Sequence, residues 1–341
     1  MDLFTQGALG AALAQAAARA PSHPVARSRL RIAGGFGFLA GMAPDLDALI
    51  RSASDPLVFL EYHRHFTHAL AFIPVGALAC AGLLHAALGR RWGLAFRQTF
   101  LFCALGYATH GVLDAATSYG TMLLWPFADV RIAASLVSIV DPLFTLPLAV
   151  LVAVSWRRRA PGWALAGLAW ATAYLAAASV QHDRAHDAAS ALAAARGQVP
   201  VRVEVKPSFG NIVVWRAIAE TADGYHVDAV RAGARMRTFE GVAVARLDPA
   251  RDLPWLDPAS RQADDIARFR RFSDGFIALD PARPHRIIDI RYSFLPNEID
   301  ALWSIEVSPD APADAHARYR THRNDARANL GRLWRMVAGA S

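Results

Sequence analysis

Four long apolar runs in the first half of the sequence constrain the fold more than any other feature. They cover residues 67–88, 98–116, 136–156 and 162–180. Each is close to the roughly 20 residues that a helix needs to cross a hydrocarbon core of ~30 Å, so each is predicted to span a membrane. Two shorter apolar stretches, 3–18 and 32–43, are predicted to be short or re-entrant helices packed against the spans.

The charged residues divide the chain into two parts. Residues 1–180 carry 13 Lys and Arg and 8 Asp and Glu, whereas residues 181–341 carry 23 and 21. We therefore predict a mostly α-helical protein, in which a polytopic transmembrane helical bundle (1–180) is followed by a small soluble α+β domain (181–341). The chain starts with Met1-Asp2 and lacks the basic region of a signal peptide, so we expect no cleaved signal.

Period-two alternation of apolar residues predicts strands in the second part. The predicted strands cover 199–205, 211–219, 225–230, 287–294 and 302–307. Asp223-Gly224 is a typical hairpin turn between two of them, and a helix is expected over 257–272. His226, His285, His316 and His322 show no ligand spacing. The role of this part, which is either to cover a site or to bind a partner, stays open.

Arginines mark alternate loops of the first part. Short cytoplasmic loops are enriched in Lys and Arg, so loops with several arginines are predicted to face the cytoplasm. These arginines are Arg19, Arg27, Arg29, Arg31, Arg90, Arg91, Arg97, Arg157, Arg158 and Arg159. The connections 44–66 and 117–135 hold only three arginines. We expect them and the soluble part on the opposite side, which for a bacterial inner membrane is the periplasm.

The formal net charge of +7 does not indicate a nucleic-acid-binding protein. The basic residues are almost all arginine, with Lys206 the single lysine, and they form no patch interleaved with aromatic residues. We expect membrane lipids as partners and no stable complex with nucleic acid. Cys80 and Cys103 lie inside apolar runs, which excludes a disulfide framework and a thiolate metal site.

Histidine and aspartate gather at one end of the predicted spans. Ionisable groups at a membrane edge are costly unless they have partners, so they are candidates for function. They are Asp45, Asp47, His63, His65, His68, His110, Asp114 and Asp141. Each lies at the predicted periplasmic end of its segment. Imidazole and carboxylate are the ligands that zinc or manganese takes where thiolate is absent.

The spacing within this group predicts a metal site. His110 and Asp114 are four residues apart, so they share one face of a helix. His65 and His68 would share a face if a helix had already begun at residue 65, and His63 would approach from the preceding turn. The predicted ligands are Asp45, Asp47, His63, His68, His110 and Asp114.

Each of these residues also has a simpler explanation when it is taken alone. Asp45 would cap a helix, and a single histidine at a membrane interface is usually a capping or interfacial side chain. His65 and His85 fit that explanation best. Asp45 and Asp47 together alternate in a Pro-led loop, which suits direct ligation or the bridging of two ions. The convergence of the whole set at one membrane face favours the metal site.

Short motifs throughout the first part carry a family resemblance. They lie at residues 1–10, 44–47 (PDLD), 63–64 (HR), 67–68 (TH), 109–114 (THGVLD), 117–120 (TSYG), 124–127 (LWPF) and 141–143 (DPL). With these residues the chain resembles the YdjM-type family of membrane-bound metal-dependent hydrolases, most strongly over residues 1–150. Many members have histidine where this chain has Gln6, which can supply an amide oxygen at best.

The resemblance implies a multi-helix membrane domain, a divalent metal and hydrolase activity. The family is more remotely similar to helical zinc-dependent phospholipases C and single-strand nucleases, so the implied reaction is phosphoester hydrolysis and a phospholipid headgroup is the natural substrate. The implied cofactor is zinc, with manganese as the alternative, and it would activate a water molecule. Asp47 or Asp141 is expected to act as a base or to orient an imidazole. Arg64 or Arg131 is expected to hold the phosphate.

A transporter or ion-binding membrane protein without hydrolytic activity is the alternative, with the same residues passing a metal or relaying protons. Transporters place ionisable groups near the middle of the bilayer and contain paired repeats. Here these groups lie at one end of the spans, and no internal repeat is evident. An inactive scaffold that displays the soluble domain is a third hypothesis.

Overall fold

The computed structural model describes residues 1–18, 24–322 and 326–339, and the chain divides into two units. The helical unit contains residues 1–50, 62–179 and 209–211. The second unit contains residues 51–61, 180–208 and the described part of 212–341. Arg19 lies outside the described residues, and the side chain of Arg27 is not described. Their place in a cytoplasmic loop therefore stays a prediction.

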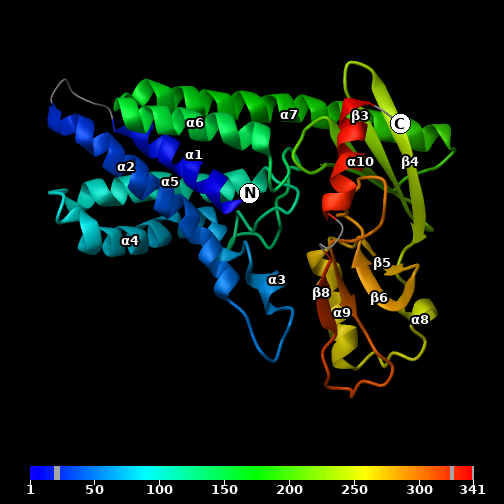
Figure 1. Cartoon of the computed structure of the whole chain (residues 1–341). Helices are drawn as coiled ribbons and strands as arrows, with labels where there is room; N and C mark the ends of the chain where they lie inside the picture. Colours follow the sequence, from blue (N-terminus) through cyan, green and yellow to red (C-terminus); the bar gives the residue numbers. More distant parts are fainter. Residues whose placement is uncertain (19–23, 323–325, 340–341) are drawn as a thin grey trace. The chain divides into compact units, whose positions relative to one another are not determined.

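The helices of the helical unit begin at recognisable caps. Asp2 accepts a hydrogen bond from the backbone of Thr5 at the start of α1, and Asp141 caps α6 ahead of Pro142. The elements are α1 (Leu3–Ala17), α2 (Pro24–Met42), η1 (Ala43–Leu49), η2 (Phe66–His68), η3 (Leu70–Phe72), α4 (Ile73–Leu84), η4 (His85–Gly89), α5 (Phe96–Ala115), α6 (Pro142–Arg158) and α7 (Pro161–Ala195) (Figure 1). Helix α7 continues from this unit into the second one. The short helix α3 (Val58–Tyr62) belongs to the second unit except for its last residue.

Glycines allow three of these helices to approach closely. Helices α1, α2 and α5 pack against one another. A Cβ added to Gly106 of α5 would lie 2.2 Å from the carbonyl oxygen of Gly37 in α2, and one added to Gly10 of α1 would lie 2.5 Å from the same oxygen. Small residues at such contacts are typical of helices that pack in lipid, where apolar side chains gain little by associating.

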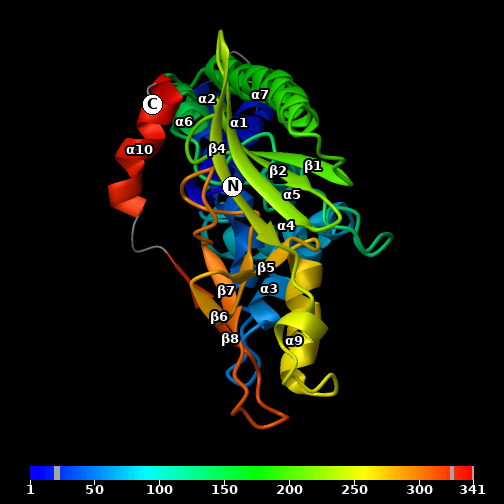
Figure 2. The ribbon, with the colours of Figure 1, turned by 90° about the vertical axis from the view of Figure 1, so that its right-hand side faces the viewer.

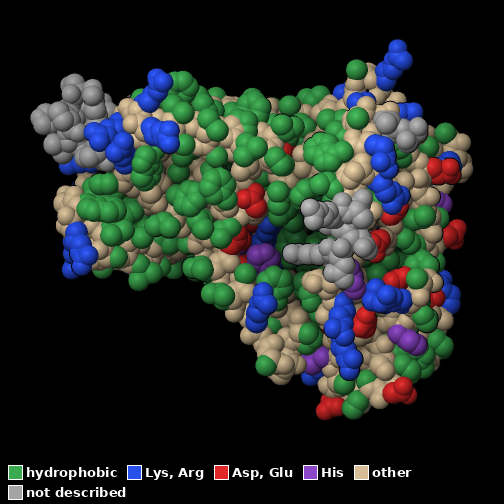
Figure 3. All heavy atoms as spheres, in the orientation of Figure 1, with side chains coloured by type: hydrophobic (Ala, Val, Ile, Leu, Met, Phe, Trp, Pro, Cys, Tyr) green, Lys and Arg blue, Asp and Glu red, His purple; other side chains and the backbone are tan. Residues whose placement is uncertain are grey.

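Two helical stretches among the described residues are long and apolar enough to cross a membrane, namely Leu70–Gly89 and Pro161–Ala195. They coincide with the predicted spans 67–88 and 162–180. Large apolar side chains such as Leu78 and Leu83 are exposed there, and Figure 3 shows hydrophobic side chains over most of the visible face of the helical unit.

The other two predicted spans form α5 and α6, and their crossing of a membrane stays a prediction. The run 136–156 is helical only from Pro142, because the proline fixes the first turn and Asp141 caps it. Residues 117–141 are instead irregular, with bridges that pair Thr117 with Val137 and Thr121 with Ile132. This segment runs beside the site described below.

The second unit contains two antiparallel four-stranded sheets, ordered β1-β2-β3-β4 and β5-β6-β7-β8 (Figure 2). The strands are β1 (Arg202–Pro207), β2 (Val214–Glu220), β3 (Gly224–Ala232), β4 (Met236–Ala245), β5 (Ile277–Asp280), β6 (Arg283–Asp289), β7 (Trp303–Glu306) and β8 (Arg318–Thr321). The helices are α8 (Pro249–Asp252), α9 (Arg261–Phe272) and α10 (Ala326–Ala338). Ile218, Tyr225 and Phe276 form part of the buried core between the strands. The predicted hairpin is confirmed, since residues 221–224 join β2 to β3.

Candidate metal centre

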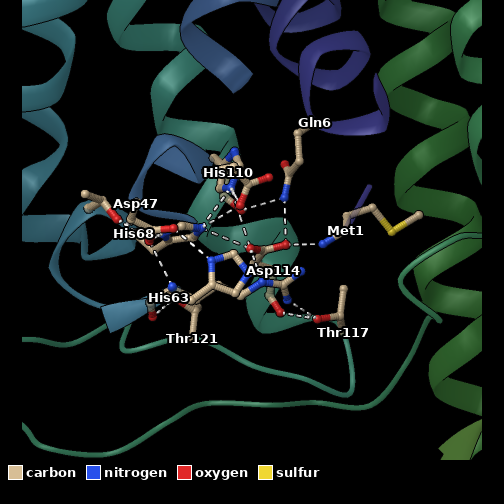
Figure 4. A network of polar contacts seen from close by, with 12 residues as sticks. Met1, Gln6, Asp47, His63, His68, His110, Asp114, Thr117 and Thr121 are labelled. Carbon is tan, nitrogen blue, oxygen red and sulfur yellow. Dashed lines mark hydrogen bonds and ion pairs between the residues drawn. The ribbon is translucent and has the colours of Figure 1, made fainter. Parts of the chain in front are cut away.

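Four side chains meet at one point in the helical unit. They come from three segments: Asp45 from η1, His68 from η2, and His110 and Asp114 from α5. One ligand atom of each lies within 4.8 Å of the others. His68, His110 and Asp114 are buried, and Asp45 is partly exposed. Figure 4 shows the side chains of His68, His110 and Asp114 pointing toward one another. Four of the six predicted ligands therefore come together.

The distances among these atoms resemble those between the ligands of a tetrahedral zinc ion. With Zn–N and Zn–O bonds of about 2.0–2.1 Å, tetrahedral ligands lie about 3.3–3.4 Å apart. The Nε2 atoms of His68 and His110 are 2.9 Å apart, and Asp45 Oδ1 lies 3.4 Å from each. Asp114 Oδ2 lies 3.3 and 3.6 Å from the same two nitrogens. We call these four atoms the ligand set.

Hydrogen bonds fix which nitrogen of each imidazole faces the ligand set. His110 Nδ1 lies 2.6 Å from the carbonyl oxygen of Gly41, which can only accept, so this nitrogen carries the proton. His68 Nδ1 lies 3.2 Å from the acceptor Asp47 Oδ2. In its neutral form, each ring would therefore turn an Nε2 lone pair into the ligand set. Two lone pairs at this distance repel each other unless a proton or a metal cation lies between them.

The carboxylate oxygens of the ligand set lack hydrogen-bond donors. Neither Asp45 Oδ1 nor Asp114 Oδ2 accepts a hydrogen bond from any residue in the described ranges. Arg64 Nε lies 3.0 Å from Asp114 Oδ2, which makes an ion pair without hydrogen-bond alignment. Buried oxygens without donors are destabilising. A divalent cation would satisfy both oxygens and both lone pairs, so the residues present fit a metal ion.

Asp47 lies behind His68 and outside the ligand set. Its Oδ2 accepts hydrogen bonds from the backbone N–H of Arg64 at 2.9 Å and from Thr67 Oγ1 at 2.7 Å. Burial alone would raise the pKa of this carboxyl, but hydrogen bonds with His63 and His68 hold the pKa below its usual range. A carboxylate at the far nitrogen of a metal-binding imidazole fixes the tautomer and the orientation of the ring.

The other oxygen of Asp114 is held from α1 and from the chain start. Gln6 Nε2 donates to Asp114 Oδ1 at 2.7 Å, and the amino group of Met1 contacts the same oxygen. Figure 4 shows both groups on the side of Asp114 away from His68. Gln6 thus contributes an N–H donor that orients the carboxylate, where the sequence suggested an amide oxygen at best.

Arg64 is buried beside Asp114, with 3 % of its surface exposed. Its Nη1 donates to Thr117 Oγ1 at 3.0 Å, and its carbonyl oxygen accepts from the backbone of Met122 and from Thr121 Oγ1. Its φ of 61° lies in the left-handed region, which is uncommon outside glycine. The expected role in holding a substrate phosphate does not fit this position. The side chain instead balances the charge of Asp114.

His63 occupies a more exposed position next to the ligand set. Its Nδ1 lies 2.8 Å from Asp47 Oδ1, and 17 % of its side chain is exposed. Asp45, Asp47 and His63 form a second group that could hold a metal ion. All six predicted ligands therefore belong to two adjoining groups that share Asp45.

Three residues considered in the sequence lie outside both groups. Asp141 is expected to act in the chemistry. Among the described residues, its carboxylate accepts hydrogen bonds from the α6 backbone and from the Tyr174 hydroxyl at 2.8 Å. The structure therefore gives it a capping position. His65 packs against the ring of Trp125, and His85 Nδ1 lies 3.1 Å from Thr99 Oγ1.

Two contributors to the site had no assigned role in the sequence. Thr67 donates to Asp47, and the carbonyl group of Gly41 accepts from His110. Thr67 stands directly before the ligand His68 in the TH motif at residues 67–68, so the sequence does indicate its place in the site. No side-chain signal marks a backbone carbonyl, and Gly41 could not be found in this way.

Comparison with known proteins concerns the part of the chain that holds the ligand set. Residues 1–185 match the family described as YdjM inner membrane protein. The chain is 34% identical over 101 residues to inner membrane protein YbcI of Escherichia coli (strain K12). That match covers 29% of this chain and 56% of the relative, so the chain spans little more than half of the relative's length. No solved structure matches the chain.

Proposed function

Because the chain belongs to the YdjM family of inner membrane proteins, we propose that it is a multi-pass hydrolase of the bacterial inner membrane. It would use a divalent metal, zinc before manganese, to cleave a phosphoester. The ligand set would lie at the periplasmic face, with the second unit in the periplasm. Membrane lipids would surround the helical unit, and a phospholipid headgroup could reach the site by lateral diffusion.

One observation supports the proposed metal site above all others. Two imidazole lone pairs and two carboxylate oxygens without donors face one another within a buried cluster. Arg64 offsets part of the charge of Asp114, but without a metal ion Asp45 Oδ1 and Asp114 Oδ2 would stay buried without hydrogen-bond donors, which is destabilising. His68 and His110 supply the nitrogen ligands, and Asp45 and Asp114 supply the oxygen ligands.

A catalytic metal site needs a coordination position that the protein does not fill. The side chain of Asp45 is 17% exposed, whereas those of His68, His110 and Asp114 are fully buried. Asp45 also belongs to the second group, with Asp47 and His63. We therefore assign Asp45 as the ligand that can turn away and leave room for a substrate oxygen.

His63 is suited to moving the proton of the attacking water. Asp47 Oδ1 accepts from His63 Nδ1, which makes Nε2 the nitrogen that can exchange a proton. The metal, when bound, would supply Lewis acidity and make water a stronger acid. Asp47 thereby orients two imidazoles, His63 through Oδ1 and His68 through Oδ2.

Arg131 is the cation that we assign to the substrate phosphate. Its guanidinium lies over the ring of Tyr119, 5.4 Å from the ring centre, and its Nη2 donates to the carbonyl oxygen of His63 at 3.3 Å. Arg131 is partly exposed, whereas Arg64 is buried. An arginine next to the proposed proton-transfer residue can pair with a phosphate oxygen.

The test uses the full chain purified in detergent or in lipid nanodiscs. Metal content is measured by mass spectrometry, and turnover is measured on phosphomonoester, phosphodiester and phospholipid panels with and without a chelator. We expect bound zinc and chelator-sensitive turnover, both lost in His110→Ala. His85→Ala removes a histidine of the same unit outside the site and should retain both.

The outcome also separates the proposal from its rivals. Zinc bound with no turnover on any panel, together with metal or proton flux into proteoliposomes, would favour the transport or ion-binding alternative. Absence of bound metal in the wild-type chain, at neutral pH and with zinc supplied, would end the metal-site proposal.

A further inference from the structure

A short segment of the N-terminal half belongs to the second unit. Residues 51–61, which we call the strap, group with the second unit, although residues 50 and 62 on either side belong to the helical unit. Leu57 and Leu60 of the strap are buried, with 1% and 3% of their surface exposed. The strap is therefore packed into the second unit and is not a free connection.

One arginine contacts the strap near its middle, at Asp55, and at its last residue, Glu61. Arg268 of α9 donates through Nη1 and Nη2 to the two carboxylate oxygens of Asp55, at 3.1 and 2.9 Å. Its Nε donates to Glu61 Oε1 at 2.6 Å. Arg268 also donates to Asp265 Oδ1 at 2.9 Å, and Asp265 is fully buried. Only 9% of the Arg268 side chain is exposed, so solvent screens these contacts weakly.

The residues around Arg268 include a third group of possible metal ligands. Asp55, Asp265 and His316 have ligand atoms close enough to hold one ion. Arg268 Nη1 already contacts both aspartates, so the guanidinium supplies the positive charge that the carboxylates need. His316 Nδ1 lies 2.9 Å from Asp265 Oδ2 and completes the cluster. This arrangement is a fixed cationic anchor and contrasts with the ligand set, whose oxygens lack donors.

The ends of the strap connect directly to the proposed metal centre. Asp47 precedes Arg51 by four residues, and His63 follows Glu61 by two. A shift of the strap would be transmitted along the backbone to both residues, and Asp47 in turn fixes the ring of His68. We propose that Arg268 is a positioning residue: by anchoring the strap in the second unit, it holds Asp47 and His63 in place for the metal centre.

This inference rests on the proposed function only where it concerns metal. Loss of a group that orients a metal ligand typically weakens metal binding by 10–100-fold. Arg268 acts on the ligand set only through the strap and Asp47, so Arg268→Ala should raise the zinc Kd by about tenfold, the lower end of that range. Asp55→Asn should act in the same direction with less risk to folding. Arg332→Ala is the matched control, because Arg332 makes an ion pair of 2.6 Å with Glu298 in the same unit and does not contact the strap.

Hydrogen exchange of the zinc-free full chain gives a second readout. We expect Arg268→Ala and Asp55→Asn to raise exchange in the strap and also in η1 and η2, with no change in Arg332→Ala. Faster exchange confined to the strap, with η1 and η2 unchanged, would overturn the proposal. If the wild-type chain binds no zinc, the proposed function fails, and the exchange data still decide whether Arg268 positions these segments.

Discussion

Replacing Asp114 by asparagine tests the ligand set against a closely matched control. Asp114 and Asp141 are both fully buried aspartates of the helical unit. Asp114 faces the imidazoles of His68 and His110, whereas Asp141 accepts from the α6 backbone and from Tyr174. The same chemical change at the two positions should affect zinc binding only at Asp114.

The expected magnitude follows from ligand-linked stability. At free zinc equal to 100 times the wild-type Kd, binding stabilises the folded chain by about 2.7 kcal/mol. Loss of an orienting partner alone costs 10–100-fold in metal affinity, so loss of an anionic ligand should cost at least about 100-fold. Asp114→Asn would then retain only about 0.4 kcal/mol of zinc stabilisation at the same concentration.

The assay compares each variant with itself, with and without zinc. Asp114→Asn also leaves the buried Arg64 without its carboxylate, which lowers stability whether or not zinc is present. The zinc-dependent difference removes that contribution. The Kd is measured by competition with a chromophoric chelator, and the stabilisation is measured by thermal unfolding in detergent.

Asp141→Asn should keep the wild-type zinc Kd, because asparagine caps a helix about as well as aspartate. A zinc Kd in Asp114→Asn within twofold of wild type would refute the ligand assignment. Equal losses in both variants would show that any buried aspartate of this unit affects the site through folding alone.

Three further predictions concern the support of the site, the helix contacts and the strap. Asp47→Asn should weaken zinc binding by about 10–100-fold without removing a ligand, as a chelator titration would show. Gly106→Ala should destabilise the helical unit by about 1–3 kcal/mol, because the added methyl would meet the α2 backbone, whereas Gly82→Ala, with no atom within 4 Å of the added Cβ, should unfold like wild type in the same thermal assay. Burial alone would raise the pKa of Asp55, but hydrogen bonding from Arg268 lowers the pKa below the usual 3.8. The strap contact should therefore persist above about pH 4 and weaken as pH falls through the lowered value, and limited proteolysis should detect no such acid step in Asp55→Asn.

Local spacing predicted the parts of the site that lie on one regular helix. His110 and Asp114 are four residues apart, and α5 brings His110 Nε2 within 3.6 Å of Asp114 Oδ2. His65 and His68 can share a face only if a helix begins at residue 65. The backbone of His65 is not helical, and η2 begins only at Phe66. The two histidines therefore point to different neighbours, and sequence spacing could not show this.

The roles of Asp45 and Asp47 could not be separated from the sequence either. Their segment folds as a 3₁₀ helix, in which residues two apart point in different directions. Asp45 thus faces the ligand set, and Asp47 faces the far side of the His68 ring. A loop of unknown geometry is compatible with either assignment for both residues.

In the second unit, the predicted strands hold buried residues, whereas β4, which holds none, was not predicted. Strands β1, β2, β3 and β7 overlap their predicted ranges, β6 overlaps the predicted range 287–294 only over residues 287–289, and α9 overlaps the predicted helix. Strand β4 is exposed or half-buried along its whole length, so its sequence lacks the two-residue hydrophobic period. The place of the strap in the second unit depends on contacts with residues some 200 positions away. No local pattern encodes such contacts.

The close contact of α2 with α5 at Gly37 and Gly106 has a consequence for the maturation of the protein. Helix α2 leads directly into η1, which carries Asp45, and α5 carries two of the other ligands. Asp45 therefore reaches His110 and Asp114 only when these helices have docked. If a metal binds as proposed, we therefore expect its binding to follow the packing of α2 against α5.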